Sequence, residues 1–170
     1  MLTPMNRFAR FIAASLLTMF SIISCEKQDS LSPVIKEDPK VYTINFKEDS
    51  VFLNLSVTQA RKESIGSVST TAMEGKMPDS VAKKYSLIIR VTGDSARSYS
   101  KAEVLAAYTD SLGEAYSSNT SDTLNKVTLT KLEKKKNGAV EGSFTIRVSN
   151  STKTKTLVLK EGKISTAFIE

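Results

Sequence analysis

The chain of 170 residues contains no histidine and no tryptophan, and it has a single cysteine, Cys25. Without histidine, neither a Ser–His nor a Cys–His nucleophile system can form within this chain. Zinc sites built from histidine or from several cysteines are excluded too, and one cysteine cannot form an intramolecular disulfide. These absences remove the commonest hydrolase and metal chemistries, so we predict no metal site and no cofactor.

Motifs for nucleotides and calcium are missing as well. The sequence contains no G-x-x-x-x-G-K-[ST], no G-x-G-x-x-G and no D-x-D-x-D-G loop, and its carboxylates are scattered along the chain. We therefore predict a protein that is not an enzyme. A hydrolase that uses two carboxylates from separate strands is the enzymatic alternative that this composition leaves open.

The N-terminus combines a basic start with a short apolar run. Arg7 and Arg10 precede Phe11–Ile23, which as a helix would span about 20 Å. That length is too short to cross a bilayer but suits the apolar part of a signal peptide. The run ends at Ile22-Ile23-Ser24-Cys25, which resembles a lipobox. The resemblance implies cleavage before Cys25, attachment of diacylglycerol to its thiol, and acylation of the new amine by a chain such as palmitate.

The alternatives are an ordinary signal peptide with a chance cysteine, or a buried helix. A buried helix is disfavoured because the run is apolar on nearly all sides. We predict a signal peptide over 1–24, a lipidated Cys25 with a flexible tether over 25–40, and one domain over 41–170. The expected location is the cell envelope, lipid-anchored at the outer membrane, with its face left open. Glu26–Asp29 resembles a charged surface-export tag, although a plain solvated linker explains it equally well.

From Val41 onward, apolar and polar residues alternate as they do in half-buried strands. The pattern predicts a hairpin of strands over 41–47 and 51–57, and a further strand over 85–92. Gln59–Lys84 lies between them and is rich in serine and threonine. We expect a long loop there that hides a short element or carries function.

Residues 100–109 admit two interpretations. Ser100-Lys101-Ala102-Glu103 matches a helical capping box, whereas the alternation up to Tyr108 favours a hairpin with Glu114–Tyr116. The hairpin is the preferred interpretation.

The C-terminal third has the clearest strand pattern. A strand begins at Val127 and slips in register at Lys131, and Asn137-Gly138 predicts a type I′ turn with two positive φ angles. Further strands follow over 144–148, 157–159 and 164–168, separated by polar turns at 149–153 and at Glu161-Gly162. The sequence predicts an all-β fold, an antiparallel sandwich or partly open barrel of about 7–9 strands.

Two glycine-containing stretches in this region, Asn137–Ile146 and Leu157–Ile164, are similar to a pattern in uncharacterised Bacteroidota-type lipoproteins. In those proteins a "v-x-G-t-F-s" strand precedes "i-t-x-G-x-F" by about 15 residues. The resemblance covers about a quarter of the chain and includes no catalytic residue. It implies an all-β lipoprotein fold and no activity.

Six of the seven aspartates are followed by serine or threonine and then by an aliphatic residue. Such triplets resemble the acceptor of the O-glycosylation system of exported Bacteroidota-type proteins, which makes the hydroxyl residues candidate glycosylation sites. These candidates are Ser30, Ser50, Ser80, Ser95, Ser111 and Thr123. The alternative is that Asp-Ser simply makes good turns, which explains the dipeptide but not the aliphatic third residue.

The chain carries a net charge of +6, and its lysines are concentrated in the C-terminal third. Nucleic acid or anionic surfaces are conceivable partners of such a region. The alternating and turn-like positions of the lysines instead favour solvated strand edges that resist aggregation, and we predict no nucleic-acid partner. The lysines concerned are Lys131, Lys134, Lys135, Lys136, Lys153, Lys155, Lys160 and Lys163.

These observations favour a lipid-anchored, non-catalytic binding or interaction module for a glycan or an envelope protein. Its ligand would meet a loop cluster, expected within Gln59–Lys84, and the lack of tryptophan weakens a stacking platform. Tyr99, Tyr108 and Tyr116 are the remaining stacking candidates, although core packing is the preferred interpretation for each. The alternative is a fimbrillin-like envelope subunit that assembles through sheet edges, with Lys163–Ile169 as a candidate donor strand.

Overall fold

The computed structural model describes residues 40–169, and every strand among them joins one antiparallel sheet. The expected signal peptide, Cys25, Ser30 and nearly all of the tether therefore lie outside the described residues. The strands follow the chain as β1 (Thr43–Glu48), β2 (Val51–Leu55), β3 (Val57–Ile65), β4 (Val68–Lys76), β5 (Ser86–Thr92), β6 (Ser98–Ser100), β7 (Val104–Thr109), β8 (Ala115–Ser118), β9 (Lys126–Leu132), β10 (Ala139–Asn150) and β11 (Thr156–Ala167).

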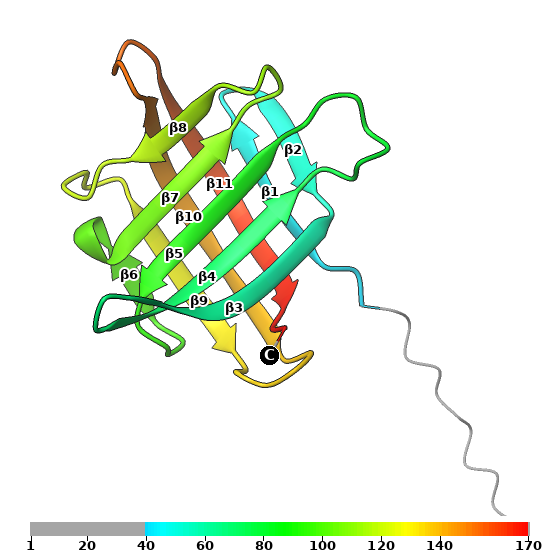
Figure 1. Cartoon of the computed structure of the whole chain (residues 1–170), viewed down its shortest axis with the longest axis vertical. Helices are drawn as coiled ribbons and strands as arrows, with labels where there is room; N and C mark the ends of the chain where they lie inside the picture. The colour runs from blue at the N-terminus through cyan, green and yellow to red at the C-terminus, as the bar shows by residue number, and fades with distance from the viewer. Residues whose placement is uncertain (1–39, 170) are drawn as a thin grey trace, which may run out of the picture. The chain divides into compact units, whose positions relative to one another are not determined.

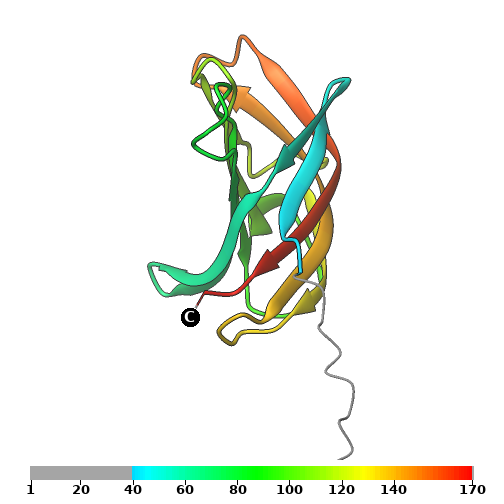
Figure 2. The same cartoon turned by 90° about the vertical axis from the view of Figure 1, so that its right-hand side faces the viewer.

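The sheet curls until its two edges nearly meet. Its order is β2-β1-β11-β10-β8-β7-β5-β4-β3, with β9 pairing the first half of β10 and β6 pairing β9. A single parallel bridge from Ala60 of β3 to Phe168 begins to close the seam between the edges. Figures 1 and 2 show the resulting flattened, barrel-like domain, with β3, β4, β5 and β7 opposite β1, β10 and β11. The predicted all-β class is confirmed, and residues 40–169 contain eleven strands rather than about 7–9, because the β3–β4 hairpin and the short β6 lack a clear sequence pattern.

The inner face of the sheet is filled by the alternating residues that the sequence pattern singled out. Ile44 and Phe46 of β1 are fully buried, as are Leu87 and Ile89 of β5. The centre of the core is aromatic. The ring centroid of Phe46 lies 5.9 Å from that of Tyr108 and 6.0 Å from that of Phe144.

The expectation of a long loop over Gln59–Lys84 is wrong for most of its length. Residues 57–76 form the β3–β4 hairpin around Gly66, and only 77–85 connects it to β5. The inner face of this hairpin carries small or polar residues, among them Ala60, Thr71 and Gly75, and Met73 is its one large buried apolar side chain. Alternation of large apolar side chains, the signal used to find strands, is therefore absent here.

For residues 100–109, the preferred hairpin is confirmed, and the capping-box signal has its own structural basis. Lys101–Glu103 forms one turn of 3₁₀ helix, in which the backbone N–H of Ser100 donates to the Glu103 carboxylate at 3.2 Å. The chain then enters β7, which pairs with β8. The capping box therefore describes the turn over 100–103, and the alternation describes the strand that follows it.

Two predicted turns differ from expectation. Asn137 has a positive φ of 62°, but Gly138 does not, so the connection over 133–138 is not a type I′ turn. Gly138 is required instead because a Cβ there would lie closer than 3.0 Å to the backbone oxygens of Glu133 and Lys135. Glu161-Gly162 is a register shift inside the continuous strand β11, where Glu161 adopts a φ of 51°.

The glycine-containing pattern of the C-terminal third marks close approaches between strands. Gly142 of β10 lies where the register with β9 shifts, and a Cβ there would collide with the backbone oxygen of Thr128. Gly162 of β11 lies directly opposite Phe144 of β10, whose ring occupies the space that a side chain would take. The pattern therefore reports packing between β9, β10 and β11.

The connections gather at two ends of the barrel. Four of them share what we call the far end: 49–50, 77–85, 110–114 and 151–155. Lys40 lies at the opposite end, because β1 begins at Thr43 opposite Ser165, near the end of β11. The ten-residue run from Thr156 to Ser165 corresponds to about 30 Å between the two ends.

Candidate functional site

An open groove lies at the far end, on the outer side of β8, β10 and β11. Its volume is about 580 Å³. The groove is lined entirely by polar residues, contributed by strand ends and by the two adjoining connections. The lining residues are Ser117, Ser118, Asn119, Thr120, Ser149, Asn150, Ser151, Lys153 and Thr156.

The floor of the groove is a row of hydroxyl groups across three strands. Ser149 of β10 is paired with Ser117 of β8 on one side and with Thr156 of β11 on the other. The Ser149 and Thr156 hydroxyl oxygens are 3.0 Å apart and hydrogen-bonded. Residues directly opposite one another in an antiparallel sheet present their side chains on the same face, so strand register alone aligns these hydroxyls.

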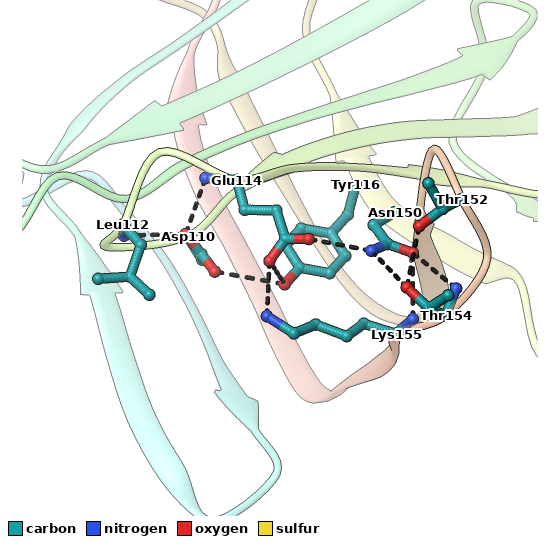
Figure 3. A network of polar contacts seen from close by, with 8 residues as sticks. All are labelled: Asp110, Leu112, Glu114, Tyr116, Asn150, Thr152, Thr154 and Lys155. Atoms are coloured by element: carbon teal, nitrogen blue, oxygen red, sulfur yellow. Dashed lines mark hydrogen bonds and ion pairs between the residues drawn. The ribbon is translucent and has the colours of Figure 1, made fainter.

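One wall of the groove, the turn over 151–155, is held by the side chain of Asn150. Its Oδ1 accepts hydrogen bonds from the backbone N–H groups of Thr154 at 3.0 Å and Lys155 at 3.1 Å. Its Nδ2 donates to a carboxylate oxygen of Glu114 at 2.9 Å and to the Thr154 hydroxyl at 3.1 Å. Figure 3 shows that Asn150 thereby joins the β10–β11 turn to the β7–β8 connection.

Glu114 is the electrostatic centre of this arrangement (Figure 3). Its carboxylate pairs with the Lys155 ammonium at 2.7 Å and also accepts from Asn150 and from the Tyr116 hydroxyl. These donors, with Lys155 first, hold the pKa of Glu114 at about 2, well below its ordinary value of 4.5. Burial and the bond to Glu114 raise the pKa of Tyr116.

The carboxylates of Asp110 and Glu114 both lie close to the Tyr116 hydroxyl. Two neighbouring carboxylates are what the hydrolase alternative would require. Tyr116 lies 2.8 Å from Glu114 and 3.3 Å from Asp110. A carboxyl group that acts as a general acid needs a raised pKa. Glu114 has the opposite shift, so at neutral pH it is ionised and cannot donate a proton. The contacts of Glu114 with Asn150 and Lys155 instead hold two turns together, and we call this arrangement the clamp of Asn150 and Glu114.

The five described candidate glycosylation sites lie in five separate connections and are not brought together. Four of the hydroxyl residues are exposed and one, Ser111, is half-buried. Ser50, Ser80 and Ser111 lie at the far end, while Ser95 and Thr123 lie in the β5–β6 and β8–β9 connections.

The aliphatic third residue of each described triplet is exposed to solvent. Leu112 is 86% exposed and Val51 is 56% exposed, and Val81, Ala96 and Leu124 also lie at the surface. At two sites the aspartate does make a turn, because Asp110 and Asp122 each accept from the backbone N–H two residues later at 2.9 Å. Turn formation thus accounts for the aspartate at these two sites, whereas core packing does not account for the aliphatic residue at any of the five.

The three tyrosines considered for ligand stacking belong to the core. Tyr99, Tyr108 and Tyr116 are at most 4% exposed, so the preferred interpretation is confirmed for all three. The hydroxyl of Tyr108 donates to the Glu48 carboxylate at 2.8 Å, which satisfies its polar end inside the barrel. Among residues 40–169, no aromatic side chain lines the groove and no three acidic side chains gather as a metal site would require.

Sequence reasoning missed the groove, because it assigned 149–153 only to a polar turn. The run Ser149-Asn150-Ser151-Thr152-Lys153-Thr154 was the available signal, although a solvated turn has the same composition. No described helix is long and apolar enough to cross a membrane. Comparisons of the chain with protein-family models, curated proteins and solved structures give no match.

Proposed function

We propose that this chain is a lipid-anchored envelope protein whose β domain binds a polar, glycan-type ligand in the groove at the far end, without catalysis. The observation that carries the proposal is the groove lining, which consists only of hydroxyl, amide and ammonium side chains. Hydroxyl and amide groups both donate and accept hydrogen bonds, so they complement the hydroxyls of a sugar. The clamp of Asn150 and Glu114 fixes one wall in advance, which lowers the entropic cost of binding.

The placement of the groove supports display from a membrane. The predicted tether enters the domain at Lys40, whereas the groove lies at the other end of β11. The groove therefore lies about 30 Å along the barrel from the point where a tether to Cys25 would leave the domain, which keeps it clear of the anchored end.

Ligand binding can be tested with the mature chain carrying Cys25→Ser, which removes the acylation site. Binding to neutral and acidic soluble polysaccharides would be measured by affinity electrophoresis. Ser149→Ala combined with Thr156→Val removes two floor hydroxyls, and we expect roughly tenfold weaker binding. Ser86→Ala with Thr92→Val, at half-buried positions on β5 outside the groove, is the matched control. Equal binding by both double variants would refute the groove as the site.

The lipid anchor is tested in the native host. Metabolic labelling with palmitate should mark the wild-type protein, and Cys25→Ser should abolish the label and release the protein from membrane fractions. Two or more acyl chains anchor a protein stably, whereas one is marginal. A labelled Cys25→Ser variant would contradict the assignment.

We also propose O-glycosylation at Ser30, Ser50, Ser80, Ser95, Ser111 and Thr123, supported by the exposure of the aliphatic residue in all five described triplets. Leu112→Gln distinguishes, at one site, recognition of the whole triplet as a glycosylation acceptor from simple turn formation by Asp-Ser. It leaves the Asp110 turn intact, because the Asp110 carboxylate accepts from the backbone N–H groups of residues 112 and 114 and makes no hydrogen bond to the Leu112 side chain. Loss of sugar mass from Ser111 in this variant is expected if the triplet is recognised. An intact mass of the native protein without added sugar would exclude modification altogether.

Assembly through sheet edges is the second candidate function, and one edge favours it. β2 is the first strand of the sheet, and Phe52 on its outer face is 62% exposed. The C-terminal segment offers less support as a donor strand. Lys163–Ala167 lies within β11, which is hydrogen-bonded to β1 on one side and to β10 on the other. Its exchange would break both ladders.

A further inference from the structure

A second depression lies on the same pair of strands as the groove, toward the opposite end of the barrel. It has a volume of about 260 Å³ and adjoins the register shift of β11. Thr145 borders this depression and Ser149 borders the groove, so the two are separated by four residues of β10, or about 13 Å. Lys126, Thr128, Ser143 and Thr145 provide polar groups along its rim.

Four lysines on or next to these strands, with Lys126 on the neighbouring β9 and Lys153 in the β10–β11 turn, have no carboxylate partner among the described residues. Lys153 belongs to the groove and Lys126 to the second depression, while Lys160 and Lys163 are exposed on β11. Lys163 is paired in register with Ser143, at the rim of the second depression. The orange and red strands on the right of Figure 2 carry this surface, which we call the β10–β11 strip.

One lysine of the strip, Lys160, lies beside another lysine and has no ion pair of its own among the described residues. Lys160 lies directly opposite Lys47 of β1, and like charges in that position destabilise a sheet. Lys47 is paired with Glu161 at 2.7 Å, but Lys160 has no such partner among residues 40–169. Glu161 is the only carboxylate that lines either depression. An anion bound over β11 would supply Lys160 with the partner that it lacks.

The opposite layer also has exposed lysines without an ion pair among residues 40–169, Lys62 of β3 and Lys76 of β4, but its other charges form a network. On β3, β4 and β5, Arg61 pairs with Glu63 at 2.7 Å and with Glu74 at 2.9 Å, and Arg90 pairs with Glu63 at 2.7 Å. Two cations face two carboxylates there, so the network is neutral. Free positive charge together with rows of hydroxyls is found along the β10–β11 strip.

We propose that the ligand of the groove is an acidic polysaccharide that extends along the β10–β11 strip, with its anionic groups over Lys126, Lys153, Lys160 and Lys163. This inference rests on the proposed function and specifies its ligand class. Two depressions about 13 Å apart, joined by outward polar residues of β10, suit an extended chain of several sugar units rather than one small molecule. The hydroxyls bind the sugar, and the lysines select the acidic form.

The test uses the mature Cys25→Ser chain with three probes: polygalacturonate, dextran sulfate and uncharged dextran. Lys126, Lys153, Lys160 and Lys163 are changed together to glutamine. The control changes Lys62, Lys76, Lys83 and Lys101 to glutamine, which removes the same charge from exposed sites outside the strip. We expect binding of an acidic probe to fall roughly tenfold or more in the strip variant and far less in the control, since each exposed charge pair contributes modestly. The two acidic probes distinguish carboxylate from sulfate recognition.

Two further outcomes separate this inference from the proposed function. If Ser149→Ala with Thr156→Val weakens binding but the strip variant does not, the groove binds a ligand and the extension along the strip is wrong. If wild-type protein prefers phosphatidylglycerol vesicles to every polysaccharide, the surface binds membranes and the inference is overturned. Binding of an acidic probe should also weaken steeply with added salt, and salt-independent binding would contradict it without any variant.

Discussion

At the scale of single residues, Gly162 shows how one missing side chain determines the packing of two strands. A Cβ on residue 162 would lie less than 3.0 Å from three carbons of the Phe144 ring. We expect Gly162→Ala to lower the free energy of unfolding by about 1–3 kcal/mol, because overpacking forces neighbouring groups to move. Urea denaturation measures this change.

The control for this prediction is a double-mutant cycle. Phe144→Leu removes the ring at some cost in packing, and it should make Gly162→Ala less harmful. Additive free energies for the two substitutions would show that the ring and the glycine do not interact.

Glu114 should give the domain a specific sensitivity to acid. Its pKa is lowered from 4.5 to about 2 in the folded protein, so its ionised form is favoured by folding. The stabilisation from this group is therefore complete above about pH 5 and is lost as the pH falls toward 2. The difference in unfolding free energy between wild type and Glu114→Gln should be constant at neutral pH and shrink below pH 4.5. Lys155→Met should reduce the same pH dependence, and an unchanged acid profile in both variants would contradict the assignment.

At the scale of elements, the turn between β10 and β11 depends on one amide. Asn150→Ala removes both acceptor bonds to the turn and the donor bond to Glu114, and we expect a loss of about 1–2 kcal/mol. Amide hydrogen exchange at 151–155 should become faster while exchange in β5 stays unchanged. Asn150→Asp retains the acceptor but places a carboxylate beside Glu114, so it is compared with Asn150→Ala in a Glu114→Gln background, where that repulsion is absent and the turn bonds should be preserved. Equal effects of alanine and aspartate in that background would show that the acceptor bonds do not hold the turn.

Strands with alternating large side chains could be predicted from sequence, and those without them could not. The pattern from Tyr42 to Phe46 identified β1, since its apolar positions face the core. The β3–β4 hairpin is not evident from the sequence because Met73 is the one large buried apolar side chain on its inner face, beside Ala60 and Thr71. The interruption of β11 at Glu161-Gly162 was interpreted as a turn, although it is a bulge whose glycine accommodates Phe144.

The groove could not be predicted because it depends on strand register. Ser117, Ser149 and Thr156 are aligned only when β8 and β11 flank β10. A single sequence shows that each is a polar residue near a turn, but it does not reveal which strands are neighbours. Similarly, Glu114 and Lys155 are 41 residues apart in the chain and meet only across two turns. Long-range pairing is the information that local periodicity lacks.

At the scale of the whole molecule, the C-terminus closes the barrel. Phe168 is 1% exposed, forms the parallel bridge to Ala60, and is followed by Ile169, whose N–H donates to the Ala60 oxygen at 3.0 Å. Phe168→Ala should lower the free energy of unfolding by about 3–5 kcal/mol, as for other buried aromatic side chains. Hydrogen exchange should accelerate in β3, which is the edge strand next to the seam. Ile169→Ala, which keeps the backbone bond and changes a half-exposed side chain, is the control. If exchange in β3 were unaffected by Phe168→Ala, the seam would be closed by other contacts, such as the backbone hydrogen bond from Ile169 to Ala60.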